Sequence, residues 1–503
     1  MRRAPTRAWV AACGILLVAC GGHARGAAEN GAAGAAAVPS GNWTTFDYNS
    51  QRSGVGPADI GIGAANVGRL GTRVVHIDGT VDSSAIELHG VMARGRARDV
   101  IVVTTTYGKT IAIDPGTGAK LWEYTPASYR SLAGGPQITT ATPVADPTRR
   151  FVYAATPDGH IHKLSVSTGA EIRSGRWPVR ITFDPTREKI ASALNISGRF
   201  VVAATGGYLG DAPIYEGHVV AIDRGTGRVA GVWNAECSDR HHLLNPPSSC
   251  RADTTFGGSA FWARAGAVVE PGTRRLLAAT GNGPFNGSTN WGDSVVELTP
   301  DTGRLLQSWT PSDQAQLNGN DTDLGSTAPA ILPPTRGFRL AVQGGKDAEL
   351  HLLNLSRLNG RGGGASGRLG GEIEDVAAPG PVFTAPVVWS RGGRTYVFVA
   401  TDSGTAAYVL RIGRRAHLAS VWNNGTPGTS PVLAGGLLYV YDESAGALNV
   451  YGPASGRRLA SLDAGGGHWN SPIAIGGRVI LPTGSANDHD TSGEVLIYHL
   501  PGR

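Results

Sequence analysis

Residues 110–124 read TIAIDPGTGAKLWEY, an apolar run, a turn that ends in Thr-Gly, and a short second run that carries a tryptophan. The same order returns as VVAIDRGTGRVAGVW over 219–233 and as VVELTPDTGRLLQSW over 295–309. Glycine takes a positive φ at little cost in such a turn, and the aspartate before it can bind the backbone that follows. Each unit therefore predicts a β-hairpin, and its recurrence predicts a repeat protein.

Weaker copies of this unit continue along the chain, at 161–172, 350–360, 406–422 and 448–462, and a half-unit, EVLIYHL, occupies 494–500. The mean spacing is about 55 residues, which accommodates four short strands, the pattern of a propeller blade. We predict an all-β fold, a single β-propeller of about eight four-stranded blades over residues 41–503. A count of seven is the alternative. The terminal half-unit predicts that N- and C-terminal strands join in one blade, which removes exposed sheet edges.

The composition agrees with a turn-rich β protein. Glycine supplies 73 of 503 residues, and charged residues make up 17%, against the usual value of about 25%. Hydrophobic residues, at 41%, are too frequent for a disordered chain. The formal net charge is +6, yet only five basic residues are lysines and no basic run exceeds two. We therefore expect no nucleic-acid partner.

The N-terminus has the features of an export signal. Three arginines precede an apolar run over 8–19, too short to span a membrane, which ends Leu-Val-Ala immediately before Cys20. This resembles a bacterial lipobox and predicts a lipoprotein signal peptide over 1–19, lipidation of Cys20, and a flexible Gly/Ala tether over 20–40. The expected location is the extracytoplasmic side of a bacterial envelope, with the membrane as partner. An ordinary signal peptide with an incidental cysteine is the alternative.

Two further cysteines, Cys237 and Cys250, fall within the predicted propeller. Export to an oxidising compartment favours a disulfide between them, and two free thiols or half of a metal site are the alternatives. The sequence contains no Cys-x-x-Cys-His, so we expect no covalently attached haem.

Four passages carry a family resemblance. They are WTTFDYNSQRSGVGPADIGIGAANVGRL (43–70), TGNGPFNGSTNWGDSVVELTPDTGRLLQSW (280–309), NDTDLGSTAPAIL (320–332) and the Gly-Gly-Lys at 344–346. With the blade motif, they resemble the quinoprotein alcohol dehydrogenases, which use pyrroloquinoline quinone (PQQ). The third and fourth passages resemble the polyvinyl-alcohol dehydrogenase branch most. The resemblance implies a PQQ-type propeller with PQQ and Ca²⁺ as cofactors.

In that family, Ca²⁺ is held by a Glu, an Asn and an Asp, and the Asp also acts as the base. By motif, Asn282 matches the Asn ligand, and Asp321 or Asp323 matches the ligand and catalytic base. Tyr208 stands where the Glu is expected, so the resemblance implies a degraded Ca²⁺ site. The alternative for Asn282 and the two aspartates is turn formation in Gly-rich loops.

The resemblance also implies cofactor-binding residues. Trp262 matches the tryptophan stacked under the quinone, and Lys346 matches the basic residue that hydrogen-bonds its oxygens. We expect these two residues, Asn282 and one of the two aspartates to converge near the propeller axis, with Tyr208 at the same pocket. The alternative for Trp262 is a structural role, in which its side chain packs between neighbouring blades.

Two functions follow from these observations. The first is a PQQ-dependent dehydrogenase, a lipid-anchored envelope protein that oxidises an alcohol and passes electrons to an external acceptor. The alternative is a non-catalytic, lipid-anchored propeller that binds a ligand or an envelope protein partner as a scaffold.

Overall fold

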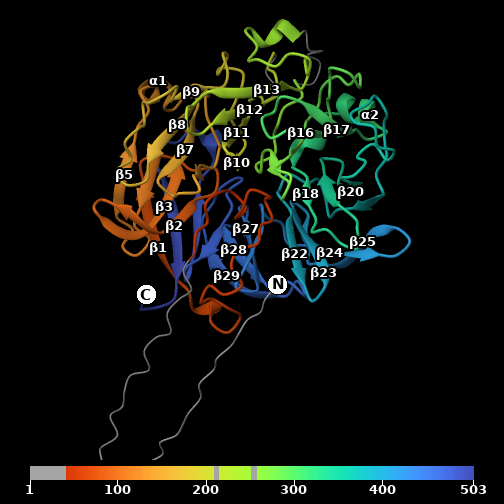
Figure 1. Cartoon of the computed structure of the whole chain (residues 1–503). Helices are drawn as coiled ribbons and strands as arrows, with labels where there is room; N and C mark the ends of the chain where they lie inside the picture. The colour runs from red at the N-terminus through yellow and green to blue at the C-terminus, as the bar shows by residue number, and fades with distance from the viewer. Residues whose placement is uncertain (1–40, 209–213, 251–257, 503) are drawn as a thin grey trace, which may run out of the picture. The chain divides into compact units, whose positions relative to one another are not determined.

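A computed structural model describes residues 41–208, 214–250 and 258–502. Its strands form eight four-stranded sheets, each antiparallel, which follow one another around a closed ring (Figure 1). The predicted all-β class and the eight-bladed propeller are confirmed. The predicted signal peptide, the lipidation site Cys20 and the tether lie outside the described residues.

The blades are numbered along the chain, and each is given with its strands. Blade 1 contains β2 (Ile86–Ala93), β3 (Arg96–Thr104), β4 (Thr110–Ile113) and β5 (Lys120–Tyr124). Blade 2 contains β6 (Val144–Ala145), β7 (Phe151–Thr156), β8 (His160–Ser165) and β9 (Val179–Arg180). Blade 3 contains β10 (Asn195–Ser197), β11 (Phe200–Ala204), β12 (His218–Asp223) and β13 (Val229–Asn234). Blade 4 contains β14 (Val268–Val269), β15 (Leu276–Ala279), β16 (Val295–Leu298) and β17 (Leu305–Trp309).

The second half of the ring repeats this arrangement. Blade 5 contains β18 (Ala330–Ile331), β19 (Leu340–Gly344), β20 (Glu349–Asn354) and β21 (Glu374–Ala377). Blade 6 contains β22 (Val387–Arg391), β23 (Arg394–Thr401), β24 (Gly404–Ile412) and β25 (Ala416–Asn423). Blade 7 contains β26 (Val432–Ala434), β27 (Leu437–Asp442), β28 (Ala447–Tyr451) and β29 (Arg458–Asp463). Blade 8 contains β30 (Ile473–Ile475), β31 (Arg478–Thr483), β32 (Gly493–His499) and β1 (Gly71–Ile77).

Blade 8 closes the ring by combining strands from both ends of the propeller. β1 pairs antiparallel with β32, from Gly71 opposite His499 to Ile77 opposite Gly493. The last strand of the chain thus lies between β31 and the first strand. The predicted joining of N- and C-terminal strands is confirmed, and it leaves the ring without a seam between blades 7 and 1.

The helices in the described residues are short. They are α1 (Tyr129–Leu132), α2 (Gln314–Gly319) and 3₁₀ turns at Val67–Arg69, Pro247–Cys250, Leu324–Ser326 and Ala486–Asp488. None of the helices found there is long and apolar enough to cross a membrane.

The burial of the strands follows from the stacking of blades. The inner strands β4 and β27 are buried along their whole length, because neighbouring blades cover both of their faces. The outer strand β29 alternates between exposed and half-buried positions. Because most strands are covered on both faces, their sequences are continuous apolar runs. The hydrophobic core consists of the contacts between neighbouring blades around the ring.

At two junctions between blades, a tryptophan on the outer strand of one blade contacts the glycine turn of the next. The Trp122 indole N–H, on β5, donates to the Val166 carbonyl at 2.8 Å, and the turn glycine Gly169 packs on the indole face. Trp422, on β25, repeats the arrangement with the Pro453 carbonyl at 3.0 Å and with Gly456. At these two junctions, the tryptophan and the turn glycine of the sequence repeat therefore belong to the contact between successive blades.

The disulfide between Cys237 and Cys250 is present, with the two Cα atoms 5.8 Å apart. It closes a loop that follows β13 in blade 3. The predicted pairing is confirmed, so neither cysteine is a free thiol or a metal ligand.

We expect Gly169→Ala to lower the free energy of unfolding by about 2–4 kcal/mol, seen as a lower urea midpoint. The φ of Gly169 is +75°, and a Cβ there would lie 2.6 Å from the Trp122 ring, so backbone strain and overpacking add. The matched control is Gly95→Ala, which has the same φ of +75° but nothing within 4 Å of the added carbon. The control should cost about 1–2 kcal/mol. Equal losses in the two variants would contradict a stabilising role for the tryptophan contact.

Candidate functional site

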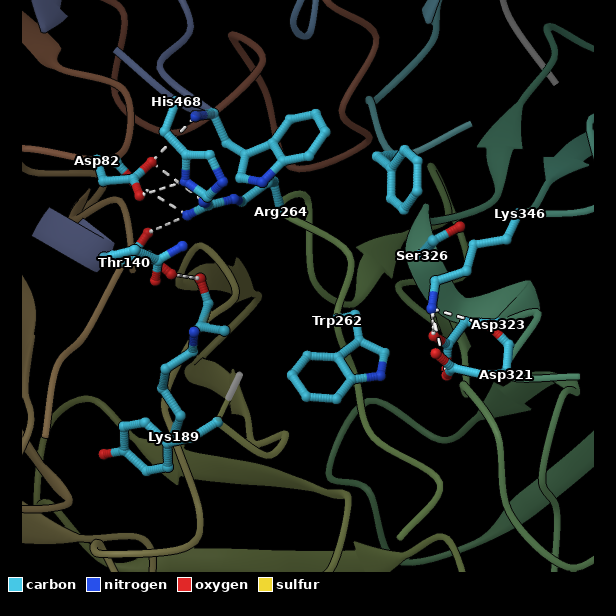
Figure 2. Close-up of a pocket in the computed structure, with 15 residues that line it drawn as sticks. Asp82, Thr140, Lys189, Trp262, Arg264, Asp321, Asp323, Ser326, Lys346 and His468 are labelled. Carbon is cyan, nitrogen blue, oxygen red and sulfur yellow. Dashed lines mark hydrogen bonds and ion pairs between the residues drawn. The ribbon is translucent and has the colours of Figure 1, made fainter. Parts of the chain in front are cut away.

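A cavity of about 550 Å³ lies where loops from different blades meet, and we call it the central pocket. Figure 2 shows its side chains pointing inward from separate loops. The lining residues are Asp82, Thr140, Lys189, Ala191, Tyr208, Trp262, Arg264, Asp321, Asp323, Ser326, Lys346, Phe383, His468, Trp469 and Asn487. Five of the predicted site residues are among them. Only Asn282 of the predicted set does not line the cavity.

Trp262 lies in the loop between blades 3 and 4 and presents its indole to the middle of the central pocket (Figure 2). Gly281, which follows β15, separates the indole from the Asp323 carboxylate. A Cβ on Gly281 would lie 2.2 Å from Asp323 Oδ1 and 2.8 Å from the Trp262 ring, so only glycine permits this approach. The Thr-Gly-Asn sequence at 280–282 therefore places an aromatic face beside a carboxylate.

Asp323 and Lys346 form an ion pair on one wall of the pocket. Lys346 Nζ lies 2.6 Å from Asp323 Oδ2, and the backbone N–H of Lys346 donates to the Asp323 carbonyl at 3.0 Å. Asp323 Oδ1 accepts the backbone N–H of Asn282 at 2.8 Å. The carboxylate is thus fixed from two sides, with its side chain 6% exposed toward the cavity.

The same two groups have shifted proton affinities. Burial raises the pKa of Asp323, and the lowering by the Lys346 ammonium does not cancel this rise. Burial alone would lower the pKa of Lys346, but the Asp323 and Asp321 carboxylates raise it above its ordinary value. Lys346 is therefore a permanent cation at neutral pH, next to a carboxyl group with an increased affinity for protons.

The structure separates the two aspartates that the sequence left equivalent. Asp321 has a positive φ of 55° and a side chain that is 53% exposed at the rim. Lys346 Nζ donates to the backbone carbonyl of Asp321 at 3.0 Å and to its carboxylate oxygen at 3.4 Å. Only Asp323, of this pair, combines burial with a fixed carboxylate, so the geometry favours Asp323 as the functional one.

Asn282 lies behind Asp323. Its side-chain Nδ2 donates to the Asp293 carboxylate at 3.2 Å and to the Leu317 carbonyl at 3.1 Å. Its Oδ1 is buried without a hydrogen-bond partner. The arrangement positions Asp323 through the Asn282 backbone and leaves one amide oxygen as a possible cation ligand.

The described residues make an incomplete Ca²⁺ site. The orphaned Asn282 Oδ1 fits a cation, but both Asp323 oxygens already accept hydrogen bonds from Asn282 and Lys346. Ca²⁺ prefers six to eight oxygen ligands. Tyr208, at the position expected for the Glu, donates its hydroxyl to the Pro185 carbonyl at 2.9 Å and offers no carboxylate. The residues present therefore do not fit a complete Ca²⁺ site.

The opposite wall contains a network around Asp82 that the sequence did not reveal. Asp82 Oδ1 accepts from Arg264 at 3.1 Å and from the Trp469 backbone, and Oδ2 accepts from His468 at 2.8 Å and from the Ala486 backbone. Burial alone would raise the Asp82 pKa, but Arg264 and these hydrogen bonds hold it well below its usual range. This buried ion pair ties loops of blades 1, 4 and 8 together.

A second polar cluster lies outside the pocket, on blade 5. Ligand atoms of Glu349, His351 and Asp375 lie within 4.8 Å of one another. His351, however, bonds Asp375 through Nδ1 at 2.7 Å and Asp347 through Nε2 at 2.9 Å. Burial alone would lower the pKa of His351, but the carboxylates of Asp347 and Asp375 raise it to about 9. Both ring nitrogens are thus protonated at neutral pH, and the cluster is an ion-pair bridge between β20 and β21.

Comparison with known proteins gives sequence relatives of one kind. The family model described as outer membrane protein assembly factor BamB matches residues 70–243. The quinohemoprotein alcohol dehydrogenase of Comamonas testosteroni is 24% identical over 355 residues, 63% of this chain and 47% of that protein. Quinohemoprotein alcohol dehydrogenase ADH IIB of Pseudomonas putida is 26% identical over 241 residues, 42% of this chain and 33% of that protein. This chain is an eight-bladed β-propeller that is similar in sequence to these proteins.

Solved structures show the same propeller fold. Quinohemoprotein alcohol dehydrogenase ADHIIG from Pseudomonas putida HK5 superposes with a TM-score of 0.67 at 16% identity, over 92% of this chain and 81% of that one. The Comamonas testosteroni enzyme gives a TM-score of 0.65 at 17% identity, with the same coverage. In sequence, the alignments span less than half of the length of the two curated relatives.

We expect Asp82→Asn to lower the free energy of unfolding by about 3–5 kcal/mol at pH 7, because it leaves Arg264 without its buried counter-ion. The pKa of Asp82 is lower in the folded state than in the unfolded state. Its contribution to the free energy of unfolding is therefore complete above the unfolded pKa of about 3.9 and is lost as the pH falls below that value. Urea titrations should therefore show a wild-type advantage that is constant at pH 5–7 and shrinks from about pH 4 to pH 2. Asp59→Asn, at an exposed position, is the control and should change little. An advantage that persists unchanged at pH 2 would refute this account.

Proposed function

We propose that the chain binds PQQ in the central pocket and uses it to oxidise an alcohol, with the electrons passing to an external acceptor. The observation that carries the proposal is the convergence of Trp262, Asp323 and Lys346 on one cavity. The sequence resemblance assigns Trp262 to stacking, Lys346 to cofactor binding and one of Asp321 and Asp323 to proton transfer. The curated relatives are named alcohol dehydrogenases, which supports the reaction class.

The pocket has the chemistry that a planar, acidic quinone requires. The indole of Trp262 offers a flat apolar surface, and Phe383 and Trp469, with ring centroids 5.4 Å apart, add a second aromatic wall. Lys346 offers a permanent cation to the quinone oxygens. The volume of about 550 Å³ lies within the usual range for cofactor sites.

Bound PQQ supplies the two-electron oxidant, and the chain supplies the base. Asp323 would accept the hydroxyl proton of the alcohol on a carboxylate oxygen, and the hydride from the alcohol carbon would go to this two-electron oxidant. Lys346 holds Asp323 in place during this transfer, and Trp262 orients the reacting face. Because burial raises the pKa of Asp323, its proton-accepting form becomes abundant only at a pH above the usual carboxyl range.

The proposed location is the envelope, outside the cytoplasm, with Cys20 as the lipid anchor. The disulfide between Cys237 and Cys250 supports an oxidising compartment. An anchor would hold the propeller near membrane-bound electron acceptors, which suits an enzyme that must discharge its electrons elsewhere.

We expect purified protein to bind PQQ, with quenching of tryptophan fluorescence as the readout. Lys346→Ala should weaken binding by roughly 10- to 150-fold, because a hydrogen bond to a charged group contributes about 1.5–3 kcal/mol. Trp262→Ala should weaken it by at least about tenfold, through loss of the stacked surface. Lys120→Ala, a surface lysine on β5, is the matched control and should bind as the wild type does. Absence of PQQ binding by the wild type would end the enzyme proposal.

We expect Asp323→Asn to lower alcohol-dependent dye reduction by about 10²–10⁴-fold while PQQ binding changes by less than about tenfold. The wild-type kcat/KM should rise with pH through a pKa above the ordinary aspartate value, and the residual activity of the variant should lack this step. Asp321→Asn discriminates between the paired aspartates. If Asp321→Asn abolishes turnover and Asp323→Asn does not, the assignment of the base is reversed.

A second candidate is a lipid-anchored scaffold without redox chemistry. The match of residues 70–243 to the family model of an outer membrane assembly factor favours it. PQQ binding that depends on Lys346 and Trp262 would argue against this candidate, whereas its absence would leave the scaffold as the better explanation.

A further inference from the structure

Lys189 lines the central pocket and has no ion-pair partner among the described residues. All five lysines of the chain fall within the described residues, and four of them have partners there. Lys109 and Lys120 pair with Glu123, Lys163 donates to the Arg224 carbonyl, and Lys346 pairs with Asp323. Lys189 Nζ has neither a hydrogen-bond acceptor nor a carboxylate partner among the described residues. Its nearest recorded contact is the Tyr208 ring, with the centroid 5.9 Å away.

The backbone holds this lysine in place. The Lys189 N–H donates to the Gly206 carbonyl at 2.7 Å, and the Gly206 N–H donates back at 2.9 Å. The next two carbonyls, of Ile190 and Ala191, accept the hydroxyls of Thr139 and Thr140. The side chain is therefore presented to the cavity by a fixed segment between blades 2 and 3.

Among the described residues, neither Asp82 nor Glu188 forms an ion pair with Lys189. Both Asp82 oxygens are committed to Arg264, His468 and two backbone N–H groups. Glu188, the preceding residue, turns away and accepts from the Thr182 hydroxyl and from the Glu216 N–H. A partly buried ammonium without an anion is unfavourable, and a ligand anion would relieve this cost.

We propose that Lys189 is a second anion-binding residue of the central pocket, which receives a carboxylate of the ligand on the side of Trp262 opposite Lys346. Figure 2 shows Lys189 to one side of the Trp262 indole, and Lys346 with its two aspartates to the other. The pocket then selects a flat aromatic molecule with negative groups at both ends. The proposal rests on the proposed function for the identity of the ligand, since PQQ is a planar tricarboxylic acid.

The proton affinity of Lys189 provides an independent readout. Burial, with repulsion from Arg264, lowers its pKa to about 8, while Asp82 acts in the opposite sense. A ligand carboxylate would raise this pKa, so binding at pH 9 should take up protons. Lys346, whose pKa lies above its ordinary value, is already protonated at that pH. The Tyr208 ring and His468 also face this part of the cavity. Proton uptake is therefore assigned to Lys189 by comparing the wild type with the Lys189 variants.

The test is calorimetric binding to the full-length protein, with three probes and matched variants. The probes are PQQ, its trimethyl ester, which lacks free carboxylates, and benzene-1,3,5-tricarboxylate. Lys189→Met should weaken PQQ binding roughly 10- to 150-fold, leave binding of the ester nearly unchanged, and abolish proton uptake at pH 9. Lys189→Arg should restore most of the PQQ affinity, and Lys120→Met should match the wild type.

The outcomes separate the two proposals. PQQ binding that is unaffected by Lys189→Met, or equal losses for PQQ and its ester, would overturn the anion-binding role and leave the proposed function standing. Lys189-dependent binding of benzene-1,3,5-tricarboxylate without any PQQ binding would support the anion site and refute the proposed function.

Discussion

A tryptophan that packs on the glycine turn of the following blade holds blades 1 and 2 together, and a second one holds blades 6 and 7 together. Trp122 and Trp422 each bond a turn carbonyl of the next blade and lie flat on its glycine, where any side chain would collide with the ring. The contact fixes the distance between neighbouring sheets, since the indole fills the gap and the hydrogen bond sets its direction. Once the blades have a fixed spacing, the loops that connect them converge on the centre, and the site depends on that convergence.

The fold could be predicted because its determinants are local. The Thr-Gly turns, the apolar runs and the spacing of about 55 residues each reflect a neighbourhood of a few residues, repeated often enough to be recognised. The disulfide pairing followed similarly, because Cys237 and Cys250 are the two cysteines within the propeller. The resemblance to quinoprotein dehydrogenases also indicated three residues, Trp262, Asp323 and Lys346, that the loops bring to one cavity.

The remainder of the site could not be predicted because it depends on distant partners. Asp82 bonds Arg264 and His468, which are 182 and 386 residues away, and its own segment carries no motif. Asp321 and Asp323 are equivalent in sequence, and they differ only after the positive φ of Asp321 directs that residue to the rim. Lys189 has no ion-pair partner in the described part of the chain, and this property is defined only once folding shows which carboxylates are bonded to other groups.

Ring closure through blade 8 has a consequence for the order of assembly. β1 emerges first during synthesis, yet its partner β32 lies about 420 residues later, with Gly71 opposite His499. Loop-closure entropy rises slowly with length, so the final pairing is thermodynamically affordable, but long-range pairing is slow. Until β32 arrives, β1 and β31, the two strands that pair with it, both lack their final neighbour. A chain interrupted late in synthesis would therefore present two open sheet edges, and quality control by chaperones or proteases would act on nearly complete molecules.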